Sequence, residues 1–115
     1  MILTLEELRA AAKRFNTKEA EIKEIGGSVY VRQVTAGELD ELQQMCKQVS
    51  EGRYPMFRAK CAAIFLSDEN GKRLYTDAQV DLLNNMNGRA IDQIFEAGMA
   101  FNSVIDYPLE ELEKN

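Results

Sequence analysis

Three threonines, each followed three residues later by Glu or Gln, divide this chain into segments. In such a capping box the Thr side chain accepts a hydrogen bond from the third helical amide, and the Glu or Gln side chain accepts one from the Thr amide. The boxes are Thr4–Glu7, Thr35–Glu38 and Thr76–Gln79. We therefore expect helices to begin directly after residues 4, 35 and 76.

Apolar residues recur at helical spacing behind these starts. The first helix is predicted to run to about Arg14, the second to Gly52 and the third to the Asn- and Gly-rich break at 84–88. Pro55 is expected in the first turn of another helical segment, from Met56 to about Leu66. A last helix is predicted over about 89–104, with an inner face of Ile91, Ile94, Phe95, Gly98 and Phe101.

Two segments alternate between polar and apolar residues, which is typical of half-buried strands. They are Glu19–Ile25 and Ser28–Val34, and Gly26-Gly27 between them predicts a two-residue hairpin turn. The expected core residues are Ala20, Ile22, Val29 and Val31, with Tyr30 and Arg32 on the other face. Leu74 and Tyr75 are expected to form a further short strand.

The predicted fold class is α+β, a mostly helical single domain with an N-terminal β-hairpin. The domain is expected to cover residues 1–107. Residues 108–115 carry three Glu against one Lys and are predicted to form a mobile acidic tail.

Charge is unevenly distributed along the 115 residues, whose net charge is −5. Residues 53–73 carry five bases against two acids, whereas residues 74–115 carry eight acids against two bases. Unlike blocks of this kind attract each other, either within one chain or between copies. Arg53, Arg58 and Lys60 are therefore candidates for self-association.

Residue types that carry common enzyme chemistry are missing or badly spaced. The chain has no histidine, and Cys46 and Cys61 fit neither a zinc pair nor a redox pair, so buried free thiols are expected. Asp68–Gly71 resembles part of a calcium loop, but the first ligand position falls on Leu66, and we interpret the segment as a turn. We predict no catalytic residue, no cofactor and no metal.

Two further classes of partner are disfavoured. An acidic chain repels phosphate backbones, although Tyr54 and Phe57 inside the basic block leave a small nucleic-acid-associated regulator open as an alternative. The longest apolar run, Cys61–Leu66, has six residues, far fewer than a membrane span needs. The N-terminus turns acidic too early for a signal peptide, so a cytoplasmic protein is expected.

The order of features resembles that of the tail assembly chaperones of long-tailed bacteriophages. An apolar run, an acidic turn with Gly, a Leu-aromatic pair and a capped helix follow one another along most of the chain. The segments that carry the resemblance are Val29–Glu38, Phe57–Tyr75, Thr76–Leu83 and the final helix ending at Phe101-Asn102.

This resemblance implies a protein that coats the long, helical tape-measure protein before tail-tube subunits polymerise around it. It implies action in the host cytoplasm and absence from the mature virion, and it leaves the tail-tube protein open as a further partner. Self-oligomerisation is expected from the unlike charge blocks and from the need to coat a long partner. Many such proteins are made in two lengths by ribosomal frameshifting, and the family supplies no catalytic residue. A head–tail connector or tail-completion protein remains open as an alternative.

A tape-measure protein is expected to present amphipathic helices, which a chaperone would receive in an apolar groove. Core packing is least complete near the breaks between helices. We therefore predict the partner surface among the exposed members of Tyr54, Met56, Phe57 and Met86. The methionines Met45, Met56, Met86 and Met99 leave two interpretations open, an adaptable binding surface or core filling.

Overall fold

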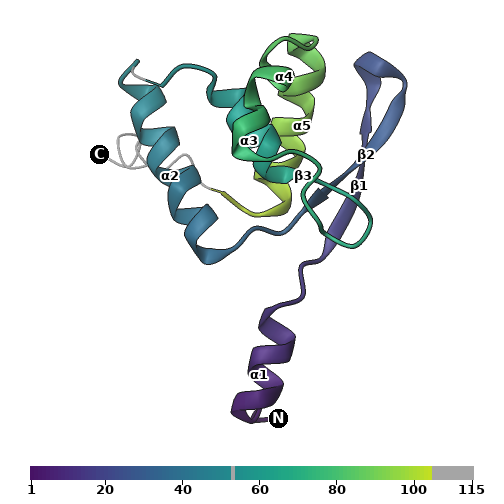
Figure 1. Cartoon of the computed structure of the whole chain (residues 1–115), viewed down its shortest axis with the longest axis vertical. Helices are drawn as coiled ribbons and strands as arrows, with labels where there is room; N and C mark the ends of the chain where they lie inside the picture. The colour runs from purple at the N-terminus through teal and green to yellow at the C-terminus, as the bar shows by residue number, and fades with distance from the viewer. Residues whose placement is uncertain (53, 105–115) are drawn as a thin grey trace.

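The computed structural model describes residues 1–52 and 54–104 and has the predicted α+β fold (Figure 1). Residues 105–115, and with them the predicted acidic tail, lie outside the described residues. The elements follow in the order α1 (Leu5–Ala12), β1 (Thr17–Ile22), η1 (Lys23–Ile25), β2 (Gly27–Arg32), α2 (Ala36–Ser50), α3 (Phe57–Phe65), β3 (Leu66–Ser67), η2 (Asp77–Gln79), α4 (Val80–Asn84) and α5 (Gly88–Phe101).

The sheet is antiparallel, with strand order β1-β2-β3. Ile22 and Val31 are fully buried, and Ala20 and Val29 pack against the core, so the predicted inner face of the hairpin is confirmed. Helix α5 packs on both long strands. The hairpin therefore contributes one side of the core and α5 covers it.

The turn of the hairpin differs from the prediction. Ile22 pairs with Gly27, so the connection consists of residues 23–26 and Gly27 already belongs to β2. Residues 23–25 form a 3₁₀ turn, and Gly26 closes it in a left-handed conformation with φ of 65°. Gly26 supplies the positive φ that closes this four-residue connection, and Gly27 pairs as a strand residue, so the two glycines do not form a two-residue turn.

Helix α3 lies at the centre of the core. Seven of its nine residues are buried, and it packs against α4 and α5. Phe65 is fully buried beside Gly98 of α5. A Cβ atom at position 98 would overlap Cγ and Cδ2 of the Phe65 ring and lie 2.7 Å from Cδ1. The glycine thus allows α5 to approach the central helix closely.

Arg32 was expected on the outer face of the hairpin, but it is 3% exposed. Its Nε donates to the Ile64 carbonyl at 2.9 Å, and its Nη2 donates to Glu38 Oε2 at 2.7 Å. The same Glu38 completes the predicted capping box of α2 by accepting from the Thr35 amide at 2.9 Å. A buried charge is tolerated when it is paired and hydrogen-bonded in this way. Arg32 therefore joins β2, the start of α2 and the end of α3.

Partial burial acts to raise the pKa of Glu38, but hydrogen bonds from Arg32 and Thr35 outweigh it and hold the pKa below its ordinary value. Arg73 adds a second cation, 3.7 Å from Glu38 Oε2, and its Nε donates to the Ala63 carbonyl at 3.1 Å. Two guanidinium groups thus lie at the carboxyl end of α3, where the helix dipole favours positive charge.

Several element boundaries also differ from the predictions. Pro55 precedes the N-cap residue Met56, so it does not lie in the first turn of α3. Leu74 and Tyr75 form no regular strand, and the only bridge there joins Ser67 to Arg73 among the residues that the structure describes. After Thr76 the chain first makes the 3₁₀ turn η2 and only then enters α4.

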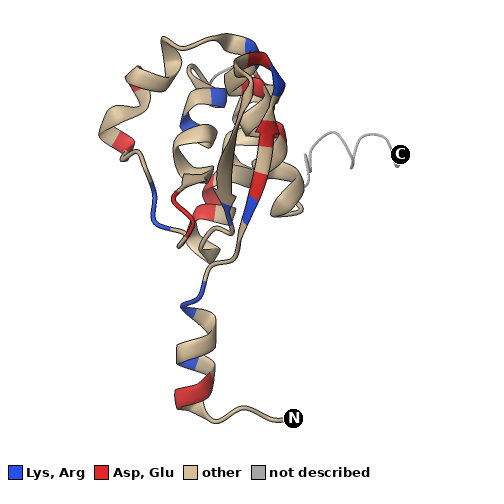
Figure 2. Ribbon diagram, turned by 90° about the vertical axis from the view of Figure 1, so that its right-hand side faces the viewer, with Lys and Arg blue, Asp and Glu red and all other residues tan. Residues whose placement is uncertain are grey.

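Helix α1 begins at the predicted capping box. The Glu7 amide donates to Thr4 Oγ1 at 3.2 Å, and the Thr4 amide donates to Glu7 Oε1 at 3.0 Å. The helix contains no buried residue and extends away from the rest of the molecule (Figures 1 and 2). None of the helices in the described part of the chain is long and apolar enough to cross a bilayer.

Candidate partner-binding groove

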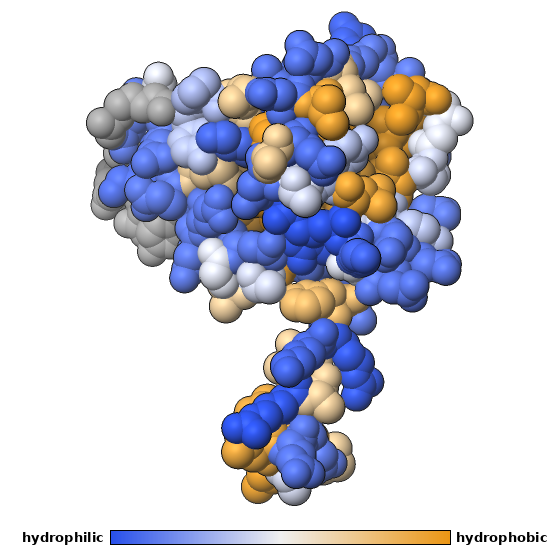
Figure 3. Space-filling model, viewed as in Figure 1, coloured by the Kyte–Doolittle hydropathy of each residue, from blue (hydrophilic) through white to orange (hydrophobic). Residues whose placement is uncertain are grey.

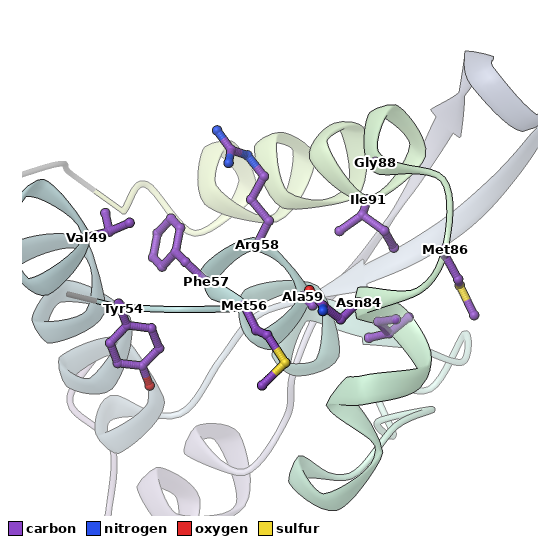
Figure 4. Close-up of a pocket in the computed structure, with 11 residues that line it drawn as sticks. Val49, Tyr54, Met56, Phe57, Arg58, Ala59, Asn84, Met86, Gly88 and Ile91 are labelled. Atoms are coloured by element: carbon purple, nitrogen blue, oxygen red, sulfur yellow. The ribbon is translucent and has the colours of Figure 1, made fainter. Parts of the chain in front are cut away.

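A hollow of about 350 Å³ opens between the end of α2, the start of α3 and the junction of α4 with α5 (Figure 4). All four residues predicted for the partner surface line it, although Met86 is 30 residues away from Met56 in the sequence. We call this hollow the methionine groove. Its lining consists of Val49, Tyr54, Met56, Phe57, Arg58, Ala59, Leu83, Asn84, Met86, Gly88 and Ile91.

Aromatic rings form one wall of the methionine groove. The Tyr54 and Phe57 rings meet edge to face with centroids 6.5 Å apart, and Phe57 meets Phe95 of α5 at 5.2 Å. Phe57 is only 9% exposed, so it is not one of the exposed members of the predicted set. Its ring supports the wall by packing and leaves most of the accessible surface to its neighbours.

Met56 and Met86 provide the flexible part of the lining. Met86 follows α4 and is 45% exposed, whereas Met56 is half-buried and lies between Tyr54 and the α4–α5 side of the groove (Figure 4). Met45, by contrast, is 2% exposed and belongs to the core. The two interpretations of the methionines therefore apply to different residues: Met45 fills the core and Met86 lies at the surface.

The backbone of Met56 has an uncommon conformation, with φ of 57°. A non-glycine residue in the left-handed region is disfavoured by roughly 1–2 kcal/mol. Here the Met56 carbonyl accepts the hydrogen bond from the Lys60 amide at 2.9 Å, in the first turn of α3. Such outliers concentrate at functional sites, and Met56 lines the methionine groove.

The sequence pattern gave no sign that Val49, Leu83 and Ile91 also line the groove. The sequence predicts Ile91 only as part of the inner face of the last helix. A second hollow, of about 260 Å³, lies on the other side of Phe57 and is lined by Cys46, Val49, Phe57, Phe95, Glu96, Met99 and Val104. Phe57 and Val49 line both hollows, and Met99 belongs only to the second.

Of the three basic residues predicted for self-association, the two that the structure describes have partners within the chain. Arg58 Nε lies 2.7 Å from Asp92 Oδ1, and the Lys60 ammonium lies 4.3 Å from the centroid of the Tyr54 ring. Arg53 lies outside the described residues. Arg73 likewise pairs with Asp77 at 2.9 Å. The basic and acidic blocks thus meet inside one chain, and their role between copies stays a prediction.

In the described ranges 1–52 and 54–104, no three Cys, Asp or Glu side chains cluster as metal ligands. Cys46 and Cys61 are buried, as predicted. Burial and the neighbouring Cys46 raise the pKa of the Cys61 thiol, which keeps it protonated and unreactive. Asp68 Oδ1 accepts from the amides of Asn70 and Lys72 at 2.8 and 3.0 Å, as expected for a turn.

Comparisons of the chain with known protein families, with curated proteins and with solved structures found no match.

Proposed function

We propose that this chain is a non-enzymatic binding protein whose methionine groove receives the apolar face of an amphipathic helix. The single observation that carries the proposal is the convergence of Tyr54, Met56, Phe57 and Met86 on one hollow. Methionine side chains are flexible and polarizable, so they adapt to the differing apolar residues that successive helical segments present. A rigid aromatic wall beside flexible methionines suits a site that binds related segments of one long partner.

The geometry of the groove favours a helix over a small molecule. The hollow lies between helix ends, and two of its apolar lining residues are accessible: Val49 is 38% exposed and Met86 is 45% exposed. An amphipathic helix can cover such a strip through residues spaced three or four apart. Arg58 lines one edge of the groove and forms an ion pair with Asp92. This polar edge can meet the polar flank of the helix.

The proposed partner is a tape-measure protein, because the sequence resembles tail assembly chaperones and a tape-measure protein is a long array of helices. In this proposal the chain coats that partner in the host cytoplasm until tail-tube subunits replace it, and it is absent from the mature virion. Coating the tape-measure protein needs no catalytic group, which agrees with the absence of histidine from the sequence.

The proposal is tested by co-expressing the tagged chain with helix-rich fragments of the tape-measure protein from the same phage genome. Wild-type chain should retain at least one fragment through purification. Met86→Glu should weaken that complex at least tenfold, because a carboxylate would have to be desolvated against an apolar helix face. The matched control is Ile25→Glu at the hairpin tip, where the side chain is 58% exposed and remote in sequence from the groove.

Phe57 is unsuitable for this test because its substitution would also remove packing against Phe95. Melting temperatures of the Glu variants should stay close to that of the wild type. Equal binding by wild type and Met86→Glu would remove the groove from the site. Failure of the wild type to retain any tape-measure fragment would refute the proposed partner.

A further inference from the structure

The second hollow lies at the point where the described chain ends. It opens between the C-terminal half of α2 and α5, with a volume of about 260 Å³. Val49 and Phe57 line it from α2 and α3, and Met99 lines it from α5. Val104, the last described residue, belongs to the same lining. Glu96 is the only charged side chain in the described lining, so the hollow is mostly apolar.

The end of α5 turns the chain toward this hollow. Ser103 has a φ of 52°, and its amide donates to the Ala100 carbonyl at 3.2 Å. The Val104 amide donates to the Met99 carbonyl at 2.9 Å. These two bonds form a Schellman motif, which ends a helix and brings the residue after the turn back against the last turn of the helix. Since Met99 and Val104 both line the hollow, the chain leaves α5 along its edge.

Asn102 fixes the position of this exit. Its side-chain amide donates to the Arg32 carbonyl, and its side-chain oxygen accepts from the Val34 amide, both at 3.0 Å. The end of α5 is thereby fastened to β2 and to the connection that leads into α2. The residues that follow therefore start from a fixed point beside the hollow.

Other exposed apolar surfaces of the molecule lack such a neighbour. Leu5 and Leu8 of α1 are more than half exposed, on the segment that extends below the rest of the molecule (Figure 3). The described chain offers nothing to cover them. The second hollow differs, because the chain continues from its edge.

The residues that follow Val104 bring an aromatic side chain within reach of the hollow. Their sequence is Ile105-Asp106-Tyr107, and three residues span at most about 10 Å. The lining residues Phe95 and Met99 are one turn of α5 apart, which corresponds to about 6 Å along the helix. The chain is therefore long enough to place the Tyr107 ring at any level of the hollow.

The chemistry of the hollow suits a tyrosine. A cavity of about 150 Å³ holds a benzene ring, so the second hollow has room for a phenol ring. Phe57 and Phe95 in its lining offer rings for edge-to-face packing, and the exposed Glu96 at its edge offers an acceptor for the hydroxyl group. Residues 108–115 are less suitable, because the three Glu among them and Glu96 repel each other.

We infer that Tyr107 occupies the second hollow of its own chain and there joins α2 to α5. A side chain tethered three residues from the hollow has an effective concentration of roughly millimolar, which favours it over a separate partner. The second hollow is then closed from within the chain, and the methionine groove is left open for a partner. The inference concerns a different hollow from the one in the proposed function, so either can fail without the other.

Nuclear Overhauser contacts of the Tyr107 ring test this placement in the wild-type chain. Val49 and Met99 line the hollow from α2 and from α5, so a ring between them should contact the methyl groups of both. The absence of either contact would overturn the inference. Contacts between Met99 and an added tape-measure fragment, in place of those with Tyr107, would also overturn it, because the hollow would then belong to the partner.

Substitution measures how much this contact stabilises the protein. Tyr107→Ser should lower the melting temperature by roughly 5–10 °C, because the ring returns to water and leaves a cavity. It should also move the Met99 methyl signal, which loses the ring current of Tyr107, and leave the Met86 signal in place. The matched control is Leu109→Ser, which should change the melting temperature by less than about 2 °C. Equal melting temperatures of the two variants would overturn the inference.

Discussion

Gly98→Ala should destabilise the protein, although alanine is the better helix former. Gly98 lies inside α5, and its Cα approaches the ring of the fully buried Phe65. An added Cβ would overlap two ring carbons of that residue. Phe65 is the last residue of α3 and is fully buried against α5, so close packing confines its ring.

The size of the effect follows from two opposing contributions. Overpacking a filled core costs typically 1–3 kcal/mol, and an overlap with two atoms of a confined ring belongs near the upper end of that range. Replacing Gly by Ala in a helix interior gains about 1 kcal/mol. The expected net loss in the free energy of unfolding is therefore about 2 kcal/mol, which lowers the melting temperature of a domain of this size by roughly 10 °C.

Urea and thermal unfolding followed by circular dichroism measure this loss directly. The matched control is Gly88→Ala at the other end of the same helix, where nothing lies within 4 Å of the new Cβ. Gly88→Ala should be as stable as the wild type or up to about 1 kcal/mol more stable. A Gly98→Ala variant that melts at or above the wild-type temperature would refute the close approach of α5 to α3.

Three further predictions concern charge, metal and the end of the chain. The pKa of Glu38 is lowered on folding, so its ionised form contributes stability above the ordinary carboxyl range. This contribution should be lost as the pH falls below about 4.5. Glu38→Gln should flatten this part of a stability-versus-pH curve, and an unchanged curve would contradict the Arg32–Glu38 pairing. A chelator should leave the melting temperature unchanged, and elemental analysis after mild purification should find no stoichiometric ion. One tightly bound zinc or calcium per chain would refute the prediction that the protein binds no metal. Truncation after Tyr107 should shift the melting temperature by less than about 2 °C, because a short acidic segment has little apolar area to bury; a larger drop would show that residues 108–115 contribute to the fold.

The sequence predicts the structure correctly where hydrogen bonds between residues close in the chain determine it. The capping boxes at Thr4 and Thr35 connect residues three apart, so the sequence contains both partners of each bond. The inner face of the hairpin follows from alternation alone. The position of its turn does not, because the choice between a two-residue turn and a 3₁₀ turn closed by Gly26 depends on which residues pair across the strands.

Long-range packing explains what sequence reasoning missed. Arg32 reads as an outward residue until the Ile64 carbonyl, 32 residues later, is placed beside it. Helix α1 has a regular apolar face, yet periodicity cannot tell whether that face packs inside its own chain or outside it. The sequence predicts the partner surface near the breaks between helices, because packing is incomplete there. That α4 and α5 also contribute lining residues can be seen only from the fold.

The central claim is that the methionine groove binds an amphipathic helix, and the methionine methyl groups report on it directly. The chain has five methionines, which isotope labelling would show as separate NMR signals. On titration with a tape-measure fragment, the methyl signals of Met56 and Met86 should shift, while Met45, 2% exposed in the core, should not. Binding that shifts only Met99, in the second hollow, or that moves none of these methyl groups, would contradict the account.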